Sequence, residues 1–213
     1  MKPLVDTIAP KRLGSGFRLL LASSWLSNTG DGMAIAAGPL LVASLTHDAF
    51  LIASGAFLQW LAPLMFSLPA GALSDRVNRK RIIVTADLLR VGLLVILSLA
   101  IAFRTLSVPL VLVALFALAT AEVFGDNTTS TLLPMLVARD DLAIANGRIM
   151  AGFITVNQLV GPPIGAVLFT AGRAWPFVGQ AVLVTVGVRM VWRIAVPSRI
   201  RDQPSKATVR QDI

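Results

Sequence analysis

The sequence predicts an all-α membrane protein with six transmembrane helices, from its composition, its long apolar segments and the placement of its basic residues. Hydrophobic residues make up 55% of the 213 residues. Charged residues make up only 14%, against about 25% in an ordinary globular domain. The mean hydropathy is +0.77. Because so few polar side chains could not cover the surface of a soluble fold, a lipid bilayer is the expected environment.

Six segments are apolar over about the 20 residues that a helix needs to cross the hydrocarbon core. They are residues 19–45, 50–73, 82–103, 108–136, 149–171 and 175–196. The links 46–49 and 104–107 are expected to be tight turns, and 74–81 and 137–148 to be longer, charged loops. The chain therefore divides into an N-terminal arm (1–18), a six-helix bundle (19–196) and a polar tail (197–213).

The basic residues predict the orientation of the bundle, because cytoplasmic loops carry an excess of Lys and Arg. Only Arg104 and Arg173 fall on the opposite side, and Arg90 and Arg189 fall inside the spans. Both termini are therefore expected in the cytoplasm, in what we take to be a bacterial inner membrane. Fifteen of the 19 basic residues share the cytoplasmic side: Lys2, Lys11, Arg12, Arg18, Arg76, Arg79, Lys80, Arg81, Arg139, Arg148, Arg193, Arg199, Arg201, Lys206 and Arg210.

The composition also excludes several classes of function. The net charge is +8, and the basic residues lie between apolar runs. This placement favours an anionic membrane face over nucleic acid as their partner. The chain has no Cys and a single histidine, His47, so disulfides, thiolate metal sites and Ser-His catalysis are not expected. No catalytic pair, metal cluster or phosphate-binding glycine loop is present. We expect neither an enzyme nor a cofactor.

Asp31 lies near the middle of the first span, twelve residues or about 18 Å from its start at 1.5 Å per residue. Ionisable residues inside a membrane are costly and are functional candidates. With Asn28, Asp31 forms a polar break, and the flanking Gly30 and Gly32 permit close approach of a neighbouring backbone or a ligand. One interpretation is a cavity-facing carboxylate that carries a proton or meets a cationic substrate. The other is a polar residue bonded to a neighbouring helix.

Two further pairs of charged residues lie inside the spans. Asp87 and Arg90 are three residues apart on one helix face, and we expect a structural ion pair. Glu122 and Asp126 are four apart and also share a face. Like charges at that spacing repel, which favours a bound proton on one of them. A role in transport is one interpretation of this pair, and neutralisation of Asp126 by Arg90 is the other.

The fifth span carries a proline-containing motif. Pro162 and Pro163 remove backbone donors and are expected to bend the helix. The flanking Gly161 and Gly165 favour close helix packing. A bent, closely packed helix suits a moving gate but also occurs in static bundles. One turn earlier, the amides Asn157 and Gln158 are placed to hydrogen-bond across the bundle.

The stretch 71–81 between the second and third spans is the most specific signal. We expect Gly71 to permit close helix approach, Asp75 to accept hydrogen bonds from helix amides or arginine, and the basic residues to anchor the turn at the membrane face. A loop that is merely basic would not explain the glycine and the acid. The spacing is set by six residues: Gly71, Asp75, Arg76, Asn78, Arg79 and Lys80.

This spacing resembles the signature loop of the major facilitator superfamily, G-x-x-x-D-[RK]-x-[GN]-[RK]-[RK], and matches every defined position. Gly161, Pro162 and Gly165 resemble the antiporter pattern G-P-x-x-G-G of the superfamily, with a departure at Ala166. Residues 28–31, 122–127 and 133–134 resemble the exporter branch that includes the enterobactin exporter and macrolide efflux proteins.

The resemblance implies alternating-access transport, driven outward by proton entry, with Asp31, Glu122 and Asp126 as candidates for proton coupling. Family members have twelve spans in two six-helix halves, so the chain is expected to be an N-terminal half, with 197–213 as the start of a central linker. The expected partners are a small drug- or siderophore-like substrate, protons, membrane lipid, and a second six-helix half in another chain or a second copy. The alternative function is a non-transporting six-helix protein that binds or regulates a full transporter.

Overall fold

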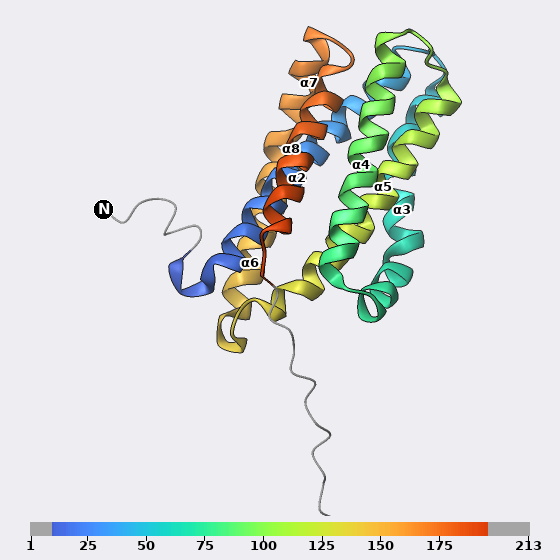
Figure 1. Ribbon diagram of the computed structural model, residues 1–213. Coiled ribbons are helices and arrows are strands. Elements are labelled where there is room, and N and C mark those ends of the chain that lie inside the picture. The colour runs from blue at the N-terminus through green and yellow to red at the C-terminus, as the bar shows by residue number, and fades with distance from the viewer. Residues whose placement is uncertain (1–9, 196–213) are drawn as a thin grey trace, which may run out of the picture.

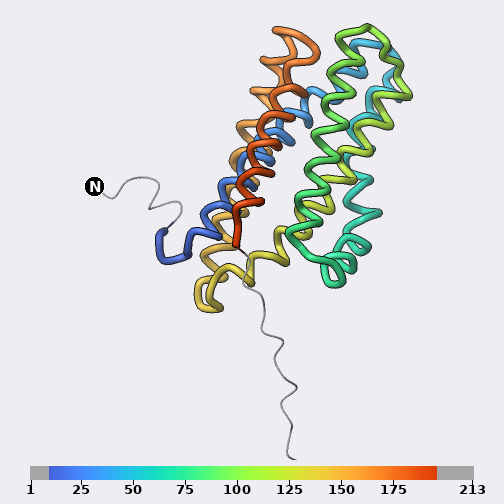
Figure 2. The backbone as a smooth tube through the Cα atoms, viewed as in Figure 1, coloured from blue at the N-terminus to red at the C-terminus, as the bar shows by residue number. Residues whose placement is uncertain are grey.

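The computed structural model describes residues 10–195, and every regular element in that range is a helix (Figures 1 and 2). The polar tail, and the arm as far as residue 9, lie outside the described residues. An all-α membrane fold is confirmed.

Four of the six crossings are single helices that match the predicted segments to within a few residues. They are α3 (Ala49–Arg76), α4 (Arg79–Ala102), α5 (Val108–Leu132) and α8 (Trp175–Trp192). The first, α2 (Gly14–Ala43), begins five residues earlier than expected. The fifth is built from α6 (Leu142–Gly152), a π-helix (Phe153–Val160) and α7 (Gly161–Ala171). Three short 3-10 helices are Lys11–Leu13, Leu133–Met135 and Arg139–Asp141.

Two links are shorter than the sequence predicted, because their residues join the helices. The expected loop 74–81 reduces to Val77 and Asn78. The Asn78 side chain accepts a hydrogen bond from the Arg81 N–H at 3.3 Å, so α4 starts at once with a capped first turn. The expected loop 137–148 holds a 3-10 turn, and α6 already begins at Leu142.

Five helical segments in the described range are long and apolar enough to cross a membrane: 49–76, 79–102, 108–135, 139–171 and 175–192. The first crossing, α2, is not among them. Its 30 residues span about 45 Å at 1.5 Å per residue, so length is not the reason. Ser23, Ser27, Asn28 and Asp31 lower its hydropathy, and all four are buried inside the bundle. Polar residues of α2 therefore face other helices and not lipid.

The helices form two groups of three, with α2, α7 and α8 in one and α3, α4 and α5 in the other (Figure 1). Within the groups α2 packs on α7 and α8, and α5 packs on α3 and α4. The groups meet mainly where α4 packs on α8. Two buried apolar clusters lie along this junction, one around Phe17 and Leu132, the other around Leu94 and Phe177.

The two ends of the bundle differ in charge. The turns after α2, α4 and α7 lie together at the top of Figure 1, and the remaining links lie at the bottom. We call the bottom the basic end. In the described range the other end holds only Arg104 and Arg173 as basic residues. The basic end holds Lys11, Arg12, Arg18, Arg76, Arg79, Lys80, Arg81, Arg139, Arg148 and Arg193.

Candidate functional site

A buried ionic cluster joins the two helix groups near the middle of the bundle. Arg90 of α4 is 2% exposed and pairs with Asp31 of α2 and with Asp87 of its own helix. The Arg90 Nη1 to Asp87 Oδ1 distance is 3.1 Å, which confirms the ion pair expected from their spacing. Gln180 of α8 donates from Nε2 to Asp31 Oδ1 at 2.9 Å. Three helices thus converge on one carboxylate.

Asp31 has the surroundings expected under each of its two interpretations. It bonds to neighbouring helices, and it also lines a cavity of about 360 Å³. Its second oxygen, Oδ2, is buried without a hydrogen-bond partner in the described residues. Leaving a buried carboxylate oxygen unpaired is costly.

Glu122 and Asp126 of α5 line the same cavity. Asp126 is exposed to it and Glu122 is half-buried. Neither carboxylate has a hydrogen bond or an ion pair within residues 10–195, because Arg90 pairs with Asp31 and Asp87 instead. Arg90 therefore makes no direct ion pair with Asp126 within residues 10–195. Arg90 nevertheless interacts electrostatically with all four carboxylates.

The rest of the cavity wall is largely apolar and comes from both helix groups. Trp60 and Pro63 of α3, Leu115 and Leu118 of α5, and Phe153 of the π-helix all line it. An apolar wall with a few convergent polar groups is typical of small-molecule sites. No three His, Asp or Glu side chains in the described range are arranged to hold a metal ion.

The two predicted amides of the fifth crossing differ. Asn157 is 3% exposed and donates from Nδ2 to Asn28 Oδ1 at 3.4 Å, so a hydrogen bond across the bundle is confirmed. Asn28 in turn donates to the Ser24 carbonyl at 2.8 Å. Gln158 is exposed and has no partner in the described residues.

The glycines next to the prolines bring two helix backbones into contact. A Cβ at Gly161 would lie 2.6 Å from Gly32 Cα, and one at Gly165 would lie 2.7 Å from Met33 Cα. The expected close packing is confirmed. The missing proline donors are accommodated by the preceding π-helix, in which the Gly161 N–H donates to Val156 O, five residues back.

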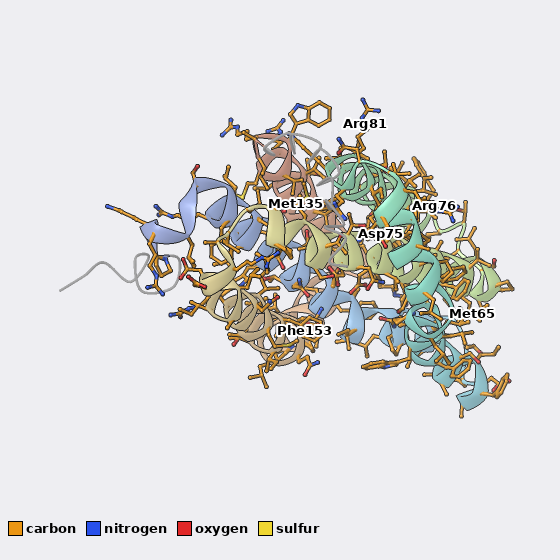
Figure 3. All side chains as sticks on the ribbon, turned by 90° about the horizontal axis from the view of Figure 1, so that it is seen from below. Met65, Asp75, Arg76, Arg81, Met135 and Phe153 are labelled. Atoms are coloured by element: carbon orange, nitrogen blue, oxygen red, sulfur yellow. The ribbon has the colours of Figure 1, made fainter. Side chains whose placement is uncertain are left out.

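The segment 71–81 lies at the basic end, where Asp75 and Arg76 end α3 and Arg81 follows in α4 (Figure 3). Asp75 Oδ1 and Arg79 Nη2 form an ion pair at 3.5 Å. Arg79 also donates to Met135 Sδ at 3.3 Å. A Cβ at Gly71 would meet nothing within 4 Å. The close approach expected there is absent within residues 10–195, because this face of α3 carries no neighbour.

Lys80 makes a contact between helices that the sequence did not predict. Its Nζ donates to the carbonyls of Trp192 at 2.6 Å and Ile194 at 2.8 Å. These carbonyls end α8 and lack helical partners, so a cation there also stabilises the helix dipole. Lys80 therefore ties the start of α4 to the end of α8.

The sequence model of the Major Facilitator Superfamily matches residues 20–212, nearly the whole chain. The chain belongs to this superfamily. It is an integral membrane protein of a transporter family and not of an enzyme family.

Curated relatives of this major facilitator chain are efflux proteins. The chain is 25% identical to macrolide efflux protein A of Streptococcus pyogenes over 125 residues, 59% of this chain and 31% of the relative. It is 27% identical to the enterobactin exporter EntS of Shigella boydii serotype 4 (strain Sb227) over 166 residues, 76% of this chain and 39% of the relative. The chain spans about a third of the length of the curated relatives it matches.

Sequence reasoning missed Gln180, the hydrogen-bond partner of Asp31. It is the only amide side chain in the predicted span 175–196, and polar residues inside spans of a major facilitator protein face the bundle interior. That signal was available. The aromatic walls Trp60 and Phe153 carried no signal, because aromatic residues are common on lipid-facing surfaces as well.

Proposed function

We propose that this chain is the N-terminal half of a proton-coupled exporter of a small molecule. The macrolide and enterobactin exporters among its relatives suggest a drug or a siderophore-like compound as the substrate. The observation that carries the proposal is the charge of the cavity. Asp31, Glu122 and Asp126 line it, and these three carboxylates and Asp87 interact electrostatically with a single guanidinium, that of Arg90.

Proton binding is expected because the carboxylates outnumber the guanidinium groups in this region. Uncompensated charge is costly away from water, and Glu122 and Asp126 have no hydrogen bond or ion pair in the described residues. A proton or a cationic group of the substrate would neutralise them. If the two compete for the same carboxylates, substrate binding releases a proton, and the two flows are coupled by differential affinity. Asn28, Asn157 and Gln158 are candidate polar contacts.

A second six-helix unit, in another chain or a second copy, completes the cavity in this proposal. The exposed face of α3 supports it. Trp60, Leu64 and Leu68 are 74%, 82% and 88% exposed on this helix, and Trp60 also lines the cavity. The neighbours Pro63 and Ser67 line it too, so the apolar face is continuous with the cavity wall.

The orientation is part of the proposal, with both termini in the cytoplasm of a bacterial cell. The chain has no cysteine, so single cysteines placed at Asp48, Asn78 and Arg173 report on sidedness. Asp48→Cys and Arg173→Cys are expected to react with an impermeant maleimide in intact cells, and Asn78→Cys only after the cells are opened. Labelling of position 78 in intact cells would overturn the orientation.

Coupling is tested in liposomes that contain the chain with its completing unit, a second copy in the first instance, by proton movement on addition of substrate. Glu122→Gln and Asp126→Asn are expected to abolish this movement with the bundle still folded. Asp140→Asn is the matched control, because Asp140 is exposed, lies outside the cavity and has no partner in the described residues. Normal coupling in both cavity variants would contradict the proposal and leave a binding or regulatory role.

The segment 71–81 is the proposed cytoplasmic gate, with Gly71, Asp75, Arg76, Asn78, Arg79 and Lys80 as its residues and the Gly161–Pro162–Gly165 packing as a second moving element. Asp75 pairs with Arg79 and lies outside the cavity. Asp75→Asn should thus keep substrate affinity and slow transport. A collapse of affinity with intact cycling would show that Asp75 contacts substrate.

A further inference from the structure

A second pocket opens at the end of the bundle opposite the basic end, and nothing in the proposed transport mechanism uses it. Its volume is about 540 Å³, and it is lined by Leu45, Ile101, Arg104, Leu106 and Arg173. The lining comes from the end of α2, the end of α4 with its following turn, and the turn between α7 and α8. These three segments lie at the same end of the molecule (Figure 1).

The charge of this pocket is uncompensated. Arg104 and Arg173 are the only basic residues at this end in the described range, and both line the pocket. Neither guanidinium has a hydrogen bond or an ion pair within residues 10–195. Asp48, at the same end of the bundle, accepts through Oδ1 from the Phe50 N–H at 2.8 Å and the Leu51 N–H at 3.4 Å, and forms no ion pair in the described residues. Two arginines without a counter-ion at a common pocket fit an anionic ligand.

The backbone at Arg104 supports a functional reason for this residue. Its φ is +58°, the only positive φ at a non-glycine residue in the described range. The Thr105 N–H donates to Ala100 O at 3.0 Å, five residues back, which is the C-terminal helix motif that normally places glycine at this position. Side chains in such strained conformations are concentrated at functional sites. An arginine at this position does not stabilise the turn as a glycine would, but its guanidinium lines the pocket.

The surrounding aromatic residues set the depth of the pocket in the membrane. Phe50, Phe103 and Trp175 are 78%, 74% and 56% exposed at this end. Trp is enriched at the headgroup level of the bilayer, so the exposed Trp175 indicates this level. Arg104 directly follows Phe103, and Arg173 lies two residues before Trp175. A bilayer at that level would bring the lipid phosphates close to the two guanidinium groups.

We propose that this pocket binds the phosphate of an anionic phospholipid from the leaflet at this end. Guanidinium groups bind phosphate oxygens through paired, charge-assisted hydrogen bonds. Leu45, Ile101 and Leu106 supply an apolar wall for the glycerol and the upper acyl chain. Arg104 belongs to the α3–α4–α5 group and Arg173 to the α2–α7–α8 group, so one bound phosphate would tie the outer ends of the two groups together.

The test uses the full chain, purified in an uncharged detergent, and the probe is short-chain phosphatidylglycerol. Binding is followed by the rise in the unfolding temperature as lipid is titrated. Arg104→Gly and Arg173→Gln are the site variants. Arg104→Gly also relieves the positive φ, so its unliganded form should unfold no earlier than the native chain. Arg189→Gln is the control. Arg189 is exposed on α8 far from this end, and the substitution removes the same charge as Arg173→Gln.

Each site variant is expected to weaken phosphatidylglycerol binding by about tenfold or more, the loss expected for a hydrogen bond to a charged group. The control should bind as the native chain does. A photoreactive phosphatidylglycerol should attach near Leu45, Ile101 or Leu106 in the native chain and not in the variants.

Three results would overturn the proposal. Equal affinity of the native chain and both site variants would show that the lipid binds elsewhere, for example at the basic end. An equal effect of uncharged diacylglycerol would show that the phosphate is not recognised. An equal effect of inorganic phosphate, at the same concentration and lost in the same variants, would assign the pocket to a soluble anion.

Discussion

The contact between α2 and the fifth crossing makes a quantitative prediction, because it joins backbone to backbone at glycines. In Gly32→Ala, the new Cβ would lie nearest to the Asn157 carbonyl oxygen, 2.9 Å from Gly161 Cα and 3.0 Å from the carbonyl carbon of Asn157. Carbon atoms in contact prefer about 3.5–4.0 Å. Neither neighbour is a side chain that could rotate away, so the two helices must separate by roughly 0.6 to 1 Å.

The expected loss of stability follows from two opposing terms. Overpacking of this kind costs about 1–3 kcal/mol, and contact between two backbones puts Gly32→Ala at or above the upper end. Replacing a helical glycine by alanine returns about 0.5–1 kcal/mol. The net loss is about 2 kcal/mol, or a fall of about 4–8 °C in the unfolding midpoint of a chain of this size.

The matched control is Gly92→Ala in α4, where a Cβ would meet nothing within 4 Å. This variant should be stabilised by about 0.5–1 kcal/mol, so the two substitutions are expected to have opposite signs. Thermal unfolding in detergent, followed by helical circular dichroism, measures both. The double variant Gly32→Ala, Gly161→Ala should lose less than the sum of its parts, because one separation of the helices serves both. A Gly32→Ala midpoint equal to that of Gly92→Ala would refute the reasoning.

Two further substitutions test the polar contacts that join the helix groups. Arg90→Met leaves Asp31 and Asp87 buried without their cation and should destabilise the bundle by about 3–5 kcal/mol. Adding Asp87→Asn should restore part of this loss. An unchanged unfolding midpoint in Arg90→Met would show that the cluster is solvated. Lys80→Met removes two hydrogen bonds to the end of α8. It should lower the free energy of unfolding by about 1 kcal/mol and speed amide exchange in the last turn of α8, whereas Lys80→Arg should do neither. Unchanged amide exchange in Lys80→Met would show that Lys80 does not stabilise the end of α8.

Much of the fold followed from the sequence, because membrane helices obey a simple length and hydropathy rule. The rule worked least well for α2, whose centre is polar. In the sequence Asp31 marks a functional or buried position, but hydropathy alone cannot show that Arg90 of α4 and Gln180 of α8 both bond to it. Helix ends were less predictable than helix existence. Asn78 as a cap converted an expected loop into a two-residue link, and capping depends on local geometry more than on composition.

The candidate site was predictable in its members and not in its pairings. Spacing along one helix correctly gave the Asp87–Arg90 pair, since residues three apart share a face. The choice of Asp31 and not Asp126 as the second partner of Arg90 depends on how α2, α4 and α5 are placed around one another. That placement is a property of packing between helices, which no single-helix periodicity contains.

Three successive residues of α2 contact neighbouring helices in different ways: Gly30, Asp31 and Gly32. A Cβ at Gly30 would lie 2.8 Å from Gln180 Cγ of α8, and Gly32 meets Gly161 of α7. Both contacts join α2 to its own helix group and need only the absence of a side chain. Asp31 joins α2 to Arg90 of the other group and depends on charge. A proton on Asp31 would therefore weaken the ion pair between the groups, whereas the glycine contacts within the group do not depend on charge. A change of charge in the cavity thus acts on the junction of the two groups, where a transporter would need to move.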